Sequence, residues 1–155
     1  MTPAVNFVKK QKIPYQVHEY EHQKSSESYG LEASEKLGLP ASVVFKTLVV
    51  CLDSKQLVVA LLPVDKKLNM KLAAKAAGAK KAQMADKNDV LRSTGYVLGG
   101  VSPLGQKKRL TTLVDISAVE LPSIYVSAGK RGLDIQLNPQ DLIRVLNASA
   151  VELCL

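Results

Sequence analysis

The strongest strand prediction in the sequence comes from one long apolar stretch, Val43 to Leu52. Three turn-forming residues, Asp53-Ser54-Lys55, separate it from a second apolar stretch, Gln56 to Leu62. Short apolar runs bounded by turn residues predict buried strands, and two such runs joined by a short polar segment predict a hairpin. We therefore expect a buried β-hairpin over residues 43–62.

The rest of the chain alternates between strand-like and helix-like patterns. Further strands are expected at Tyr15 to about residue 21, Lys80 to Met84, Thr111 to Asp115, Ser123 to Ala128, Leu133 to Leu137 and Val151 to Cys154. Capping residues and stop signals predict short helices at Ala4 to Lys12, Tyr29 to Leu37, Asn69 to Ala77, Asp86 to Thr94 and Asn138 to Leu146, and Gln23 to Ser28 reads as a polar loop. Hairpins interspersed with short helices predict an α+β fold with a mixed, mainly antiparallel sheet.

Length and composition limit the class of protein. At 155 residues the chain predicts a single domain, 1–155, and its 46% apolar and 23% charged residues are typical of a globular protein. No apolar run approaches the roughly 20 residues of a membrane span, and the N-terminus lacks the apolar core of a signal peptide. We therefore expect a cytoplasmic protein. Cys51 and Cys154 have no neighbouring Cys or His at metal-ligand spacing.

The charge suggests a polyanionic partner. Twenty-one Lys and Arg against fourteen Asp and Glu give a net charge of +7, while the absence of Trp and the presence of two Phe argue against base-stacking platforms. If nucleic acid binds, phosphate contacts should dominate. Clusters of basic residues occur at Lys66-Lys67, Lys71, Lys75, Lys80-Lys81 and Lys107 to Arg109. Such clusters are usually solvated faces, and they become informative only if they surround a site.

A glycine-rich segment, Gly95 to Gly105, is the first candidate site. It contains four glycines, Ser102 and Pro103, and precedes the basic triplet Lys107 to Arg109. Paired glycines at 99 and 100 allow backbone N–H groups to approach a phosphate, a carboxylate or a developing oxyanion. The alternative is a wide turn between two strands, because Gly and Pro punctuate ordinary loops.

The segment His18-Glu-Tyr-Glu-His22 is an H-E-x-x-H sequence, the zinc-protease signature. That chemistry needs both imidazoles on one face of a helix, but Pro14 and a period-two alternation favour a strand. In a strand, His18, Tyr20 and His22 would share one face, which makes Tyr20 a candidate wall of a pocket. The zinc protease remains a distant alternative.

Two charged residues interrupt apolar strands. Lys46 follows Phe45 in the longest apolar run, and an ammonium there must reach water, pair with a carboxylate or lower its pKa. It is either a solvated residue on an edge strand or a cation aimed at an anionic ligand. Asp134 interrupts Leu133 to Leu137 and, with Gln136, would face either solvent or a site. A pairing of Lys46 with Asp134 is conceivable.

Three motifs carry a family resemblance: Phe45-Lys46-Thr47 within an apolar strand, Gly99-Gly-Val-Ser-Pro103, and Ser127 to Gly132 followed by Asp134. In this order and within one short chain, they resemble the bacterial YbaK-type Cys-tRNA(Pro) deacylases, which are related to the editing domain inserted in bacterial prolyl-tRNA synthetases. The resemblance covers essentially the whole chain. It implies the family's fold, in which a strongly curved sheet carries short flanking helices.

The resemblance also implies an activity and a site. Family members hydrolyse mischarged Cys-tRNA(Pro), with Cys-tRNA(Cys) as a further candidate substrate; the thiol of the bound cysteine attacks its own ester, with no metal or other cofactor. The implied partners are the acceptor 3′ end of mischarged tRNA and prolyl-tRNA synthetase. Lys46 would hold a phosphate or polarise the ester, Gly100 would mark the oxyanion site, and Tyr20 and Asp134 would orient the aminoacyl group. The implied substrate-binding residues are Phe45, Thr47, Gly99, Val101, Ser102, Pro103, Ser127 and Gly129.

A second hypothesis comes from a different class of protein. A non-catalytic module that binds tRNA or a synthetase would keep the basic surface and the glycine-rich segment without any chemistry. The amino acid preferred, cysteine against alanine or another small residue, depends on the size of the pocket and stays open at this point.

Overall fold

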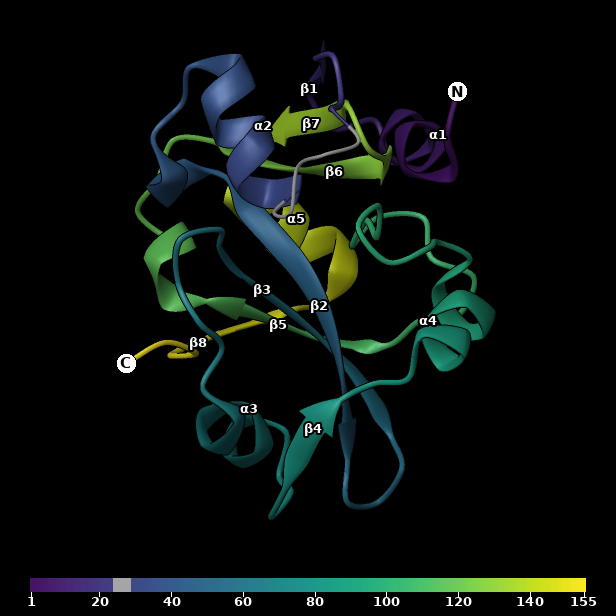
Figure 1. Ribbon diagram of the computed structural model, residues 1–155, viewed down its shortest axis with the longest axis vertical. Helices are drawn as coiled ribbons and strands as arrows, with labels where there is room; N and C mark the ends of the chain where they lie inside the picture. The colour runs from purple at the N-terminus through teal and green to yellow at the C-terminus, as the bar shows by residue number, and fades with distance from the viewer. Residues whose placement is uncertain (24–28) are drawn as a thin grey trace.

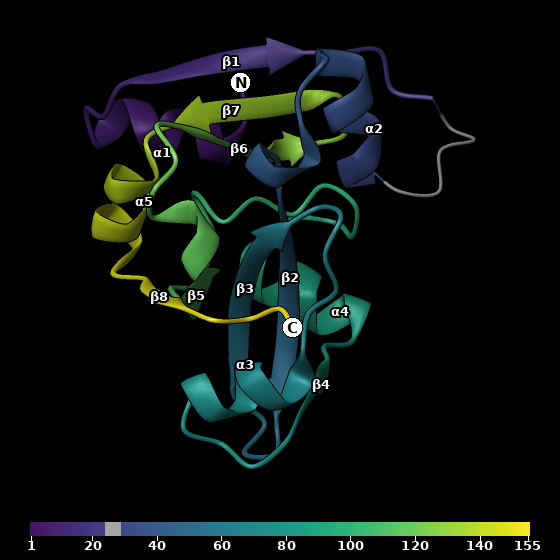
Figure 2. The ribbon, with the colours of Figure 1, turned by 90° about the vertical axis from the view of Figure 1, so that its left-hand side faces the viewer.

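The strands of the described chain form two β-sheets, where the sequence predicted one (Figures 1 and 2). The computed structural model describes residues 1–23 and 29–155, so the predicted polar loop at 23–28 falls almost entirely outside the described part. The predicted α+β class and the mainly antiparallel pairing are confirmed. The strongly curved single sheet is not, because the strands are divided between the two sheets.

The smaller sheet is antiparallel throughout, in the order β1-β7-β6. It consists of β1 (Tyr15–Glu19), β6 (Ile124–Lys130) and β7 (Leu133–Leu137). The larger sheet has the order β4-β2-β3-β5-β8, in which β3–β5 and β5–β8 are parallel pairs. Its strands are β2 (Phe45–Leu52), β3 (Leu57–Pro63), β4 (Ala82–Met84), β5 (Thr111–Asp115) and β8 (Ser149–Val151). The predicted hairpin is β2–β3.

Helices form where the capping residues predicted them. They are α1 (Pro3–Lys10), α2 (Tyr29–Leu37), α3 (Met70–Ala76), α4 (Lys87–Thr94) and α5 (Pro139–Leu146), with 3₁₀ turns η1 (Ala41–Val43) and η2 (Ile116–Ala118). The side chains of Thr2, Asn69 and Asn138 accept hydrogen bonds from the first turns of their helices. The predicted capping box of α4 is incomplete, because Asp86 accepts from Asn88 while Asp89 pairs instead with Arg92.

Several element boundaries differ from the sequence prediction, two of them at the ends of the chain. Helix α1 ends at Lys10, two residues early, and Lys12 adopts φ +57°. Strand β8 lies at Ser149–Val151 because a parallel partner, β5, selects it, whereas the alternation pointed to residues 151–154. Beyond β8, the Leu153 N–H donates to Asp115 Oδ1 at 3.0 Å, Leu153 O accepts from Asn69 N at 2.8 Å, and the Leu153 side chain is buried in the core.

The main apolar core lies where the two sheets meet. Residues of β2, β6 and β7 pack there with α1, α5 and the glycine-rich segment, among them Phe45, Val126 and Leu104. A second cluster beneath α3 covers the other face of the larger sheet. Figure 2 shows the smaller sheet lying across the upper ends of β2 and β3, with α3 and β4 at the far end of the molecule.

One backbone bridge joins the sheets in the part of the chain that the structure describes. Val44, just before β2, forms an isolated parallel bridge with Tyr125 of β6. Val44 also bonds to the residue that follows β3, because Val44 O accepts from Val64 N at 2.9 Å. The start of β2 is therefore fixed at the junction of the two sheets. Within the described ranges, no helix has the length and apolar character needed to cross a bilayer.

Candidate functional site

A cavity of about 280 Å³ opens at the junction of the sheets. Its walls come from the start of β2, the end of β1, the β6–β7 hairpin, α2 and the glycine-rich segment. The lining residues are Tyr20, Ala33, Val44, Phe45, Lys46, Thr47, Leu48, Leu98, Gly99, Val101, Ser127, Lys130, Arg131 and Asp134. The three sequence motifs, which lie far apart along the chain, thus contribute to one cavity.

Lys46 lies on an open edge of β2. Strand β4 pairs only with residues 50–52 of β2, so residues 45–48 have no strand partner on that side in the described chain. The amine is half-buried, and burial lowers its pKa against the opposing effect of Cys154 and Asp65. Lys46 and Asp134 form no ion pair within the residues described. The edge-strand hypothesis was right about the edge, but the side chain lines a cavity instead of being fully solvated.

Asp134 is a buried carboxyl group that faces this cavity. It is 5% exposed, and its neighbours across the smaller sheet are Ser127 and His18. Burial raises its pKa to about 7 because the charged form is poorly solvated. The solvent-facing interpretation of Asp134 is therefore wrong: the face that alternation assigned to it is covered by the cavity walls.

Tyr20 approaches Asp134 from the residue after β1. Its backbone N–H donates to Gly132 O at 3.0 Å, which continues the pairing of β1 with the hairpin. Burial, together with the charge of Asp134, raises the pKa of Tyr20 to about 12. The phenol is therefore a hydrogen-bond donor at neutral pH, as a pocket wall that orients a polar substrate requires.

The glycine-rich segment contains a tight β-turn, Val97 to Gly100. Gly100 N donates to Val97 O at 3.0 Å, and Gly99 adopts φ +89°, a conformation that favours glycine. A Cβ on Gly100 would lie 3.3 Å from Lys130 Cα, so the turn packs closely on the tip of the β6–β7 hairpin. Gly99 and Val101 line the cavity, whereas Gly100 lies behind it.

Three predicted substrate-binding residues do not line the cavity. Ser102 is fully buried, and its Oγ accepts from Leu104 N at 3.2 Å. Pro103 belongs to a separate cavity of about 130 Å³, which Lys108 and Arg109 also line. Gly129, at φ +104°, backs onto Tyr96, whose Cε1 would lie 2.6 Å from an added Cβ. These three residues support the glycine-rich segment and the β6–β7 hairpin on the side away from the cavity.

Three more of the predicted substrate-binding residues belong to the walls of the cavity. Phe45, Thr47 and Ser127 line the cavity. Ser127 Oγ accepts from Gly129 N at 3.1 Å, which fixes the bulge between Ser127 and Lys130. Thr47 Oγ1 is buried without a hydrogen-bond partner among the residues described.

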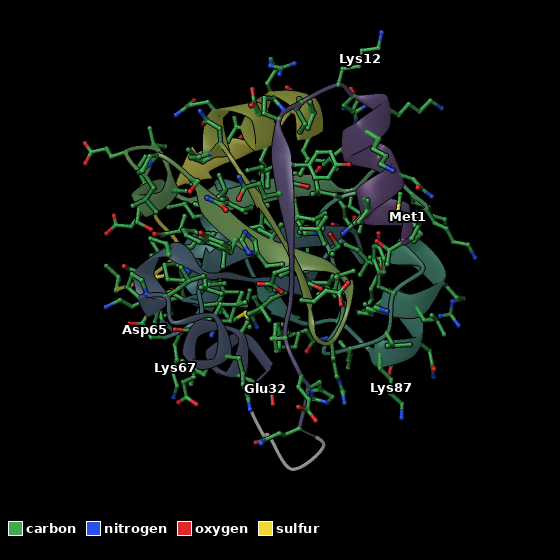
Figure 3. All side chains as sticks on the ribbon, turned by 90° about the horizontal axis from the view of Figure 1, so that it is seen from above. Met1, Lys12, Glu32, Asp65, Lys67 and Lys87 are labelled. Atoms are coloured by element: carbon green, nitrogen blue, oxygen red, sulfur yellow. The ribbon has the colours of Figure 1, made fainter. Side chains whose placement is uncertain are left out.

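Sequence reasoning missed two cations at the mouth of the cavity. Lys130 and Arg131 occupy the tip of the β6–β7 hairpin, and both are exposed. Their position between Gly129 and Gly132 identified the hairpin, but a β-bulge between Ser127 and Lys130 interrupts the alternation, so the pattern did not predict which way they face. None of the basic clusters predicted from the sequence lines this cavity. Lys12, Lys67 and Lys87 project at widely separated points of the surface (Figure 3).

The H-E-x-x-H segment is not a zinc site. His18 lies in β1 and its Nε2 is 2.8 Å from Gln136 Oε1, whereas His22 lies beyond the strand with Nδ1 2.6 Å from Glu32 Oε1. Figure 3 shows Glu32 where α2 approaches the chain leaving β1. The two imidazoles thus serve different neighbours on an extended segment, and the described residues contain no group of three or more candidate metal ligands. The zinc-protease hypothesis was wrong.

Known proteins resemble this chain in sequence and in fold. A family model described as an aminoacyl-tRNA editing domain matches residues 27–145. A protein of Enterococcus faecalis, provisionally named Cys-tRNA(Pro)/Cys-tRNA(Cys) deacylase EbsC, is 38% identical over 153 residues, which are 98% of this chain and 92% of that protein. The proline–tRNA ligase of Trichlorobacter lovleyi is 31% identical over 126 residues, 76% of this chain and 22% of the ligase.

A solved structure shares the fold. The crystal structure of a protein provisionally described as a trans-editing enzyme for prolyl tRNA synthetase matches with a TM-score of 0.86 and 19% identity, over 99% of this chain and 95% of that one. At this level of identity the match supports the arrangement of the two sheets and says nothing further about the cavity.

Proposed function

This chain belongs to the aminoacyl-tRNA editing domain family, and on that basis we propose that it hydrolyses the ester bond of mischarged Cys-tRNA(Pro), with Cys-tRNA(Cys) as a further substrate. The observation that carries the proposal is the convergence of Lys46, Asp134 and the Val97–Gly100 turn on one small cavity. Cysteine is close to proline in size, so a synthetase pocket rejects it weakly and a separate hydrolase is needed.

The chemical step follows from the substrate's own thiol. The cysteine sulfur loses its proton and bonds to the ester carbonyl carbon, the bond from that carbon to the ribose oxygen breaks, and the ribose oxygen takes up a proton. Water then opens the thiolactone to free cysteine. The protein's part is to hold the ester so that the sulfur reaches the carbonyl and the developing charge on the carbonyl oxygen is stabilised.

The donor for that oxygen differs from the one the sequence suggested. The Gly100 N–H is already committed to Val97 O within the turn. The N–H groups of Gly99 and Val101 donate to no backbone acceptor within the described chain, and both residues line the cavity. We therefore assign the oxyanion contact to these flanking amides, with Gly100 shaping the turn that presents them.

Three side chains hold the aminoacyl group in this proposal. Lys46 reaches the ester from the β2 edge, and its half-buried amine is a strong electrostatic partner because water screens it incompletely. Asp134 and the Tyr20 hydroxyl contact the α-amino group from the smaller sheet. Ser127, Phe45 and Thr47 close the cavity around the side chain of the amino acid.

A panel of charged tRNAs tests the proposal. Purified protein is incubated with Cys-, Ser-, Ala- and Pro-tRNA(Pro), and release of the amino acid is measured. Serine is nearly isosteric with cysteine but lacks the thiol, so Cys-tRNA(Pro) should be hydrolysed far faster than Ser-tRNA(Pro). Equal rates for cysteine and serine would refute thiol attack. No hydrolysis of any ester would refute the enzyme and leave the non-catalytic tRNA- or synthetase-binding module.

The proposal extends to the setting of the reaction. We take residues 1–155 as one editing domain, because the Enterococcus match spans nearly the whole chain. The similarity to part of a proline–tRNA ligase supports prolyl-tRNA synthetase as the partner that supplies the mischarged tRNA. We place the activity in the cytoplasm, where tRNAs are charged.

A further inference from the structure

The mouth of the cavity exposes two neighbouring apolar side chains. Val97 is 61% exposed and Leu98 is 49% exposed, and both belong to the turn that ends at Gly100. Leu98 also lines the cavity. An exposed apolar pair on a hydrogen-bonded turn beside a cavity offers apolar surface to a ligand that extends beyond the cavity.

Two cations stand next to this apolar pair. Lys130 and Arg131 are exposed at the hairpin tip, and Lys130 has no carboxylate within ion-pair distance in the described chain. The close approach of Gly100 to Lys130 Cα, together with a 3.5 Å contact from Arg131 Nη2 to Leu98 O, joins the turn and the hairpin tip into one unit. The unit thus presents apolar surface and positive charge side by side.

The size of the cavity determines which part of the substrate must lie on this unit. At about 280 Å³, the cavity is slightly smaller than typical small-ligand pockets, which measure roughly 300–1,000 Å³. It suits an aminoacyl group and its ester, but not the nucleotide that carries them. The nucleotide must therefore lie at the mouth of the cavity, where Leu98, Lys130 and Arg131 are the exposed residues of the lining.

Building on the proposed function, we propose that the Val97–Gly100 turn and the Lys130–Arg131 tip form a binding site for the 3′-terminal nucleotide of tRNA. The base packs against Val97 and Leu98, and the phosphate on the 5′ side of that nucleotide is bound by Lys130 and Arg131. This leaves Lys46, half-buried on the β2 edge of the cavity, to contact the ester rather than a phosphate.

Binding of an uncharged RNA tests this site separately from catalysis. The probe is a fluorescent acceptor-stem minihelix ending in CCA, compared with the same minihelix ending in CC, with affinity measured by fluorescence anisotropy. The wild-type protein should bind the CCA form roughly tenfold more tightly, the effect of one apolar side chain packed against a base. Equal affinity for the two RNAs would overturn the proposal.

Pairs of variants, one at the proposed site and one elsewhere on the surface, test which residues produce the preference for the CCA form. Leu98→Asp should abolish the preference for CCA, whereas Leu91→Asp, at a leucine 45% exposed on α4, should retain it. The double variant K130A/R131A should also lose the preference. The double variant K71A/K75A on α3, at the far end of the molecule, should keep it (Figure 2). Full preference in L98D and K130A/R131A would overturn the site.

The outcomes separate this site from the proposed function. If the wild-type protein prefers the CCA form through Leu98 and Lys130 but releases no amino acid from any charged tRNA, the nucleotide site stands and the hydrolase fails. If Cys-tRNA(Pro) is hydrolysed while the variants bind both minihelices as the wild type does, the hydrolase stands and the nucleotide site fails.

Discussion

Lys46 and Asp134 are the two charged side chains whose burial most needs an explanation. Each lies in the same cavity, and neither forms an ion pair within the residues described. Burying a charge without a partner lowers stability, and such groups are common at functional sites. A substrate that brings an ester and an α-amino group into the cavity would supply the missing partners.

Lys46→Ala should reduce deacylation of Cys-tRNA(Pro) by roughly 100- to 1,000-fold, the usual cost of removing one electrostatic contact to a developing oxyanion. Its thermal unfolding temperature should not fall, because the substitution removes a half-buried amine that has no ion pair in the described chain. Single-turnover kinetics and calorimetry make the measurement, with Lys71→Ala on the exposed face of α3 as the control. Undiminished turnover would remove Lys46 from the mechanism.

Asp134 should make stability fall as pH rises. Its folded pKa of about 7 lies above its ordinary value of 3.8, so between these two values the folded state binds more protons than the unfolded state. This contribution to the free energy of unfolding is complete below about pH 4 and is lost as pH approaches 7. Asp134→Asn, which cannot ionise, should lack that decline in denaturant titrations across pH 4–8. An identical decline in both proteins would contradict the assignment.

At the scale of the elements, the glycine-rich turn and the β6–β7 hairpin support each other. Gly100 packs on Lys130, and Gly129 packs on Tyr96, whose hydroxyl donates to Leu104 O at 2.6 Å. The hairpin tip and the loop are therefore positioned by backbone packing, and a side chain at either glycine would push them apart.

Gly129→Ala should destabilise the protein by roughly 2–4 kcal/mol, the sum of left-handed backbone strain and a clash with Tyr96. Gly78→Ala, at φ +75° with open space around its Cβ, carries the backbone cost alone, about 1 kcal/mol. Urea unfolding of both variants isolates the clash as the difference between them. Equal losses would mean that Tyr96 moves aside without cost.

Local sequence signals predicted the elements well, because caps and turns act within a few residues. Asn69, Gly95 and the Asn138-Pro139 pair mark helix ends that the structure confirms. The division into two sheets was not predictable, since the pairing of β3 with β5 and the bridge from Val44 to Tyr125 join residues far apart in sequence. Local pattern alone does not determine such long-range partners.

The candidate site was predicted in part for the same reason. Lys46, Tyr20 and Asp134 stood out as residues that interrupt or border apolar strands, and the cavity brings them together. The commitment of the Gly100 N–H to its own turn could not be foreseen, because a turn's hydrogen bond depends on its dihedral angles. Lys130 and Arg131 lie at the mouth, after a β-bulge between Ser127 and Lys130 that the alternation did not reveal.

At the scale of the whole molecule, the net charge of +7 is spread widely over the surface. Affinity for uncharged tRNA should therefore fall roughly ten- to hundredfold between 50 and 200 mM salt, for two to four neutralised phosphates. Filter binding across this range measures the slope, and hydrolysis of cysteine ethyl ester, which has no phosphate, is the control that should barely respond. A flat response for tRNA would show that the basic surface serves another purpose.

The Val44–Tyr125 bridge has an evolutionary consequence. Each sheet has its own set of inter-strand hydrogen bonds. A small shift of one sheet relative to the other would therefore change the width of the cavity between them without breaking the hydrogen bonds within either sheet. Substitutions in the residues packed between the sheets would then change the size of amino acid that the cavity accepts, without any change at Lys46 or Asp134. In such a fold, the preferred amino acid can change during evolution while the residues that act on the ester stay the same.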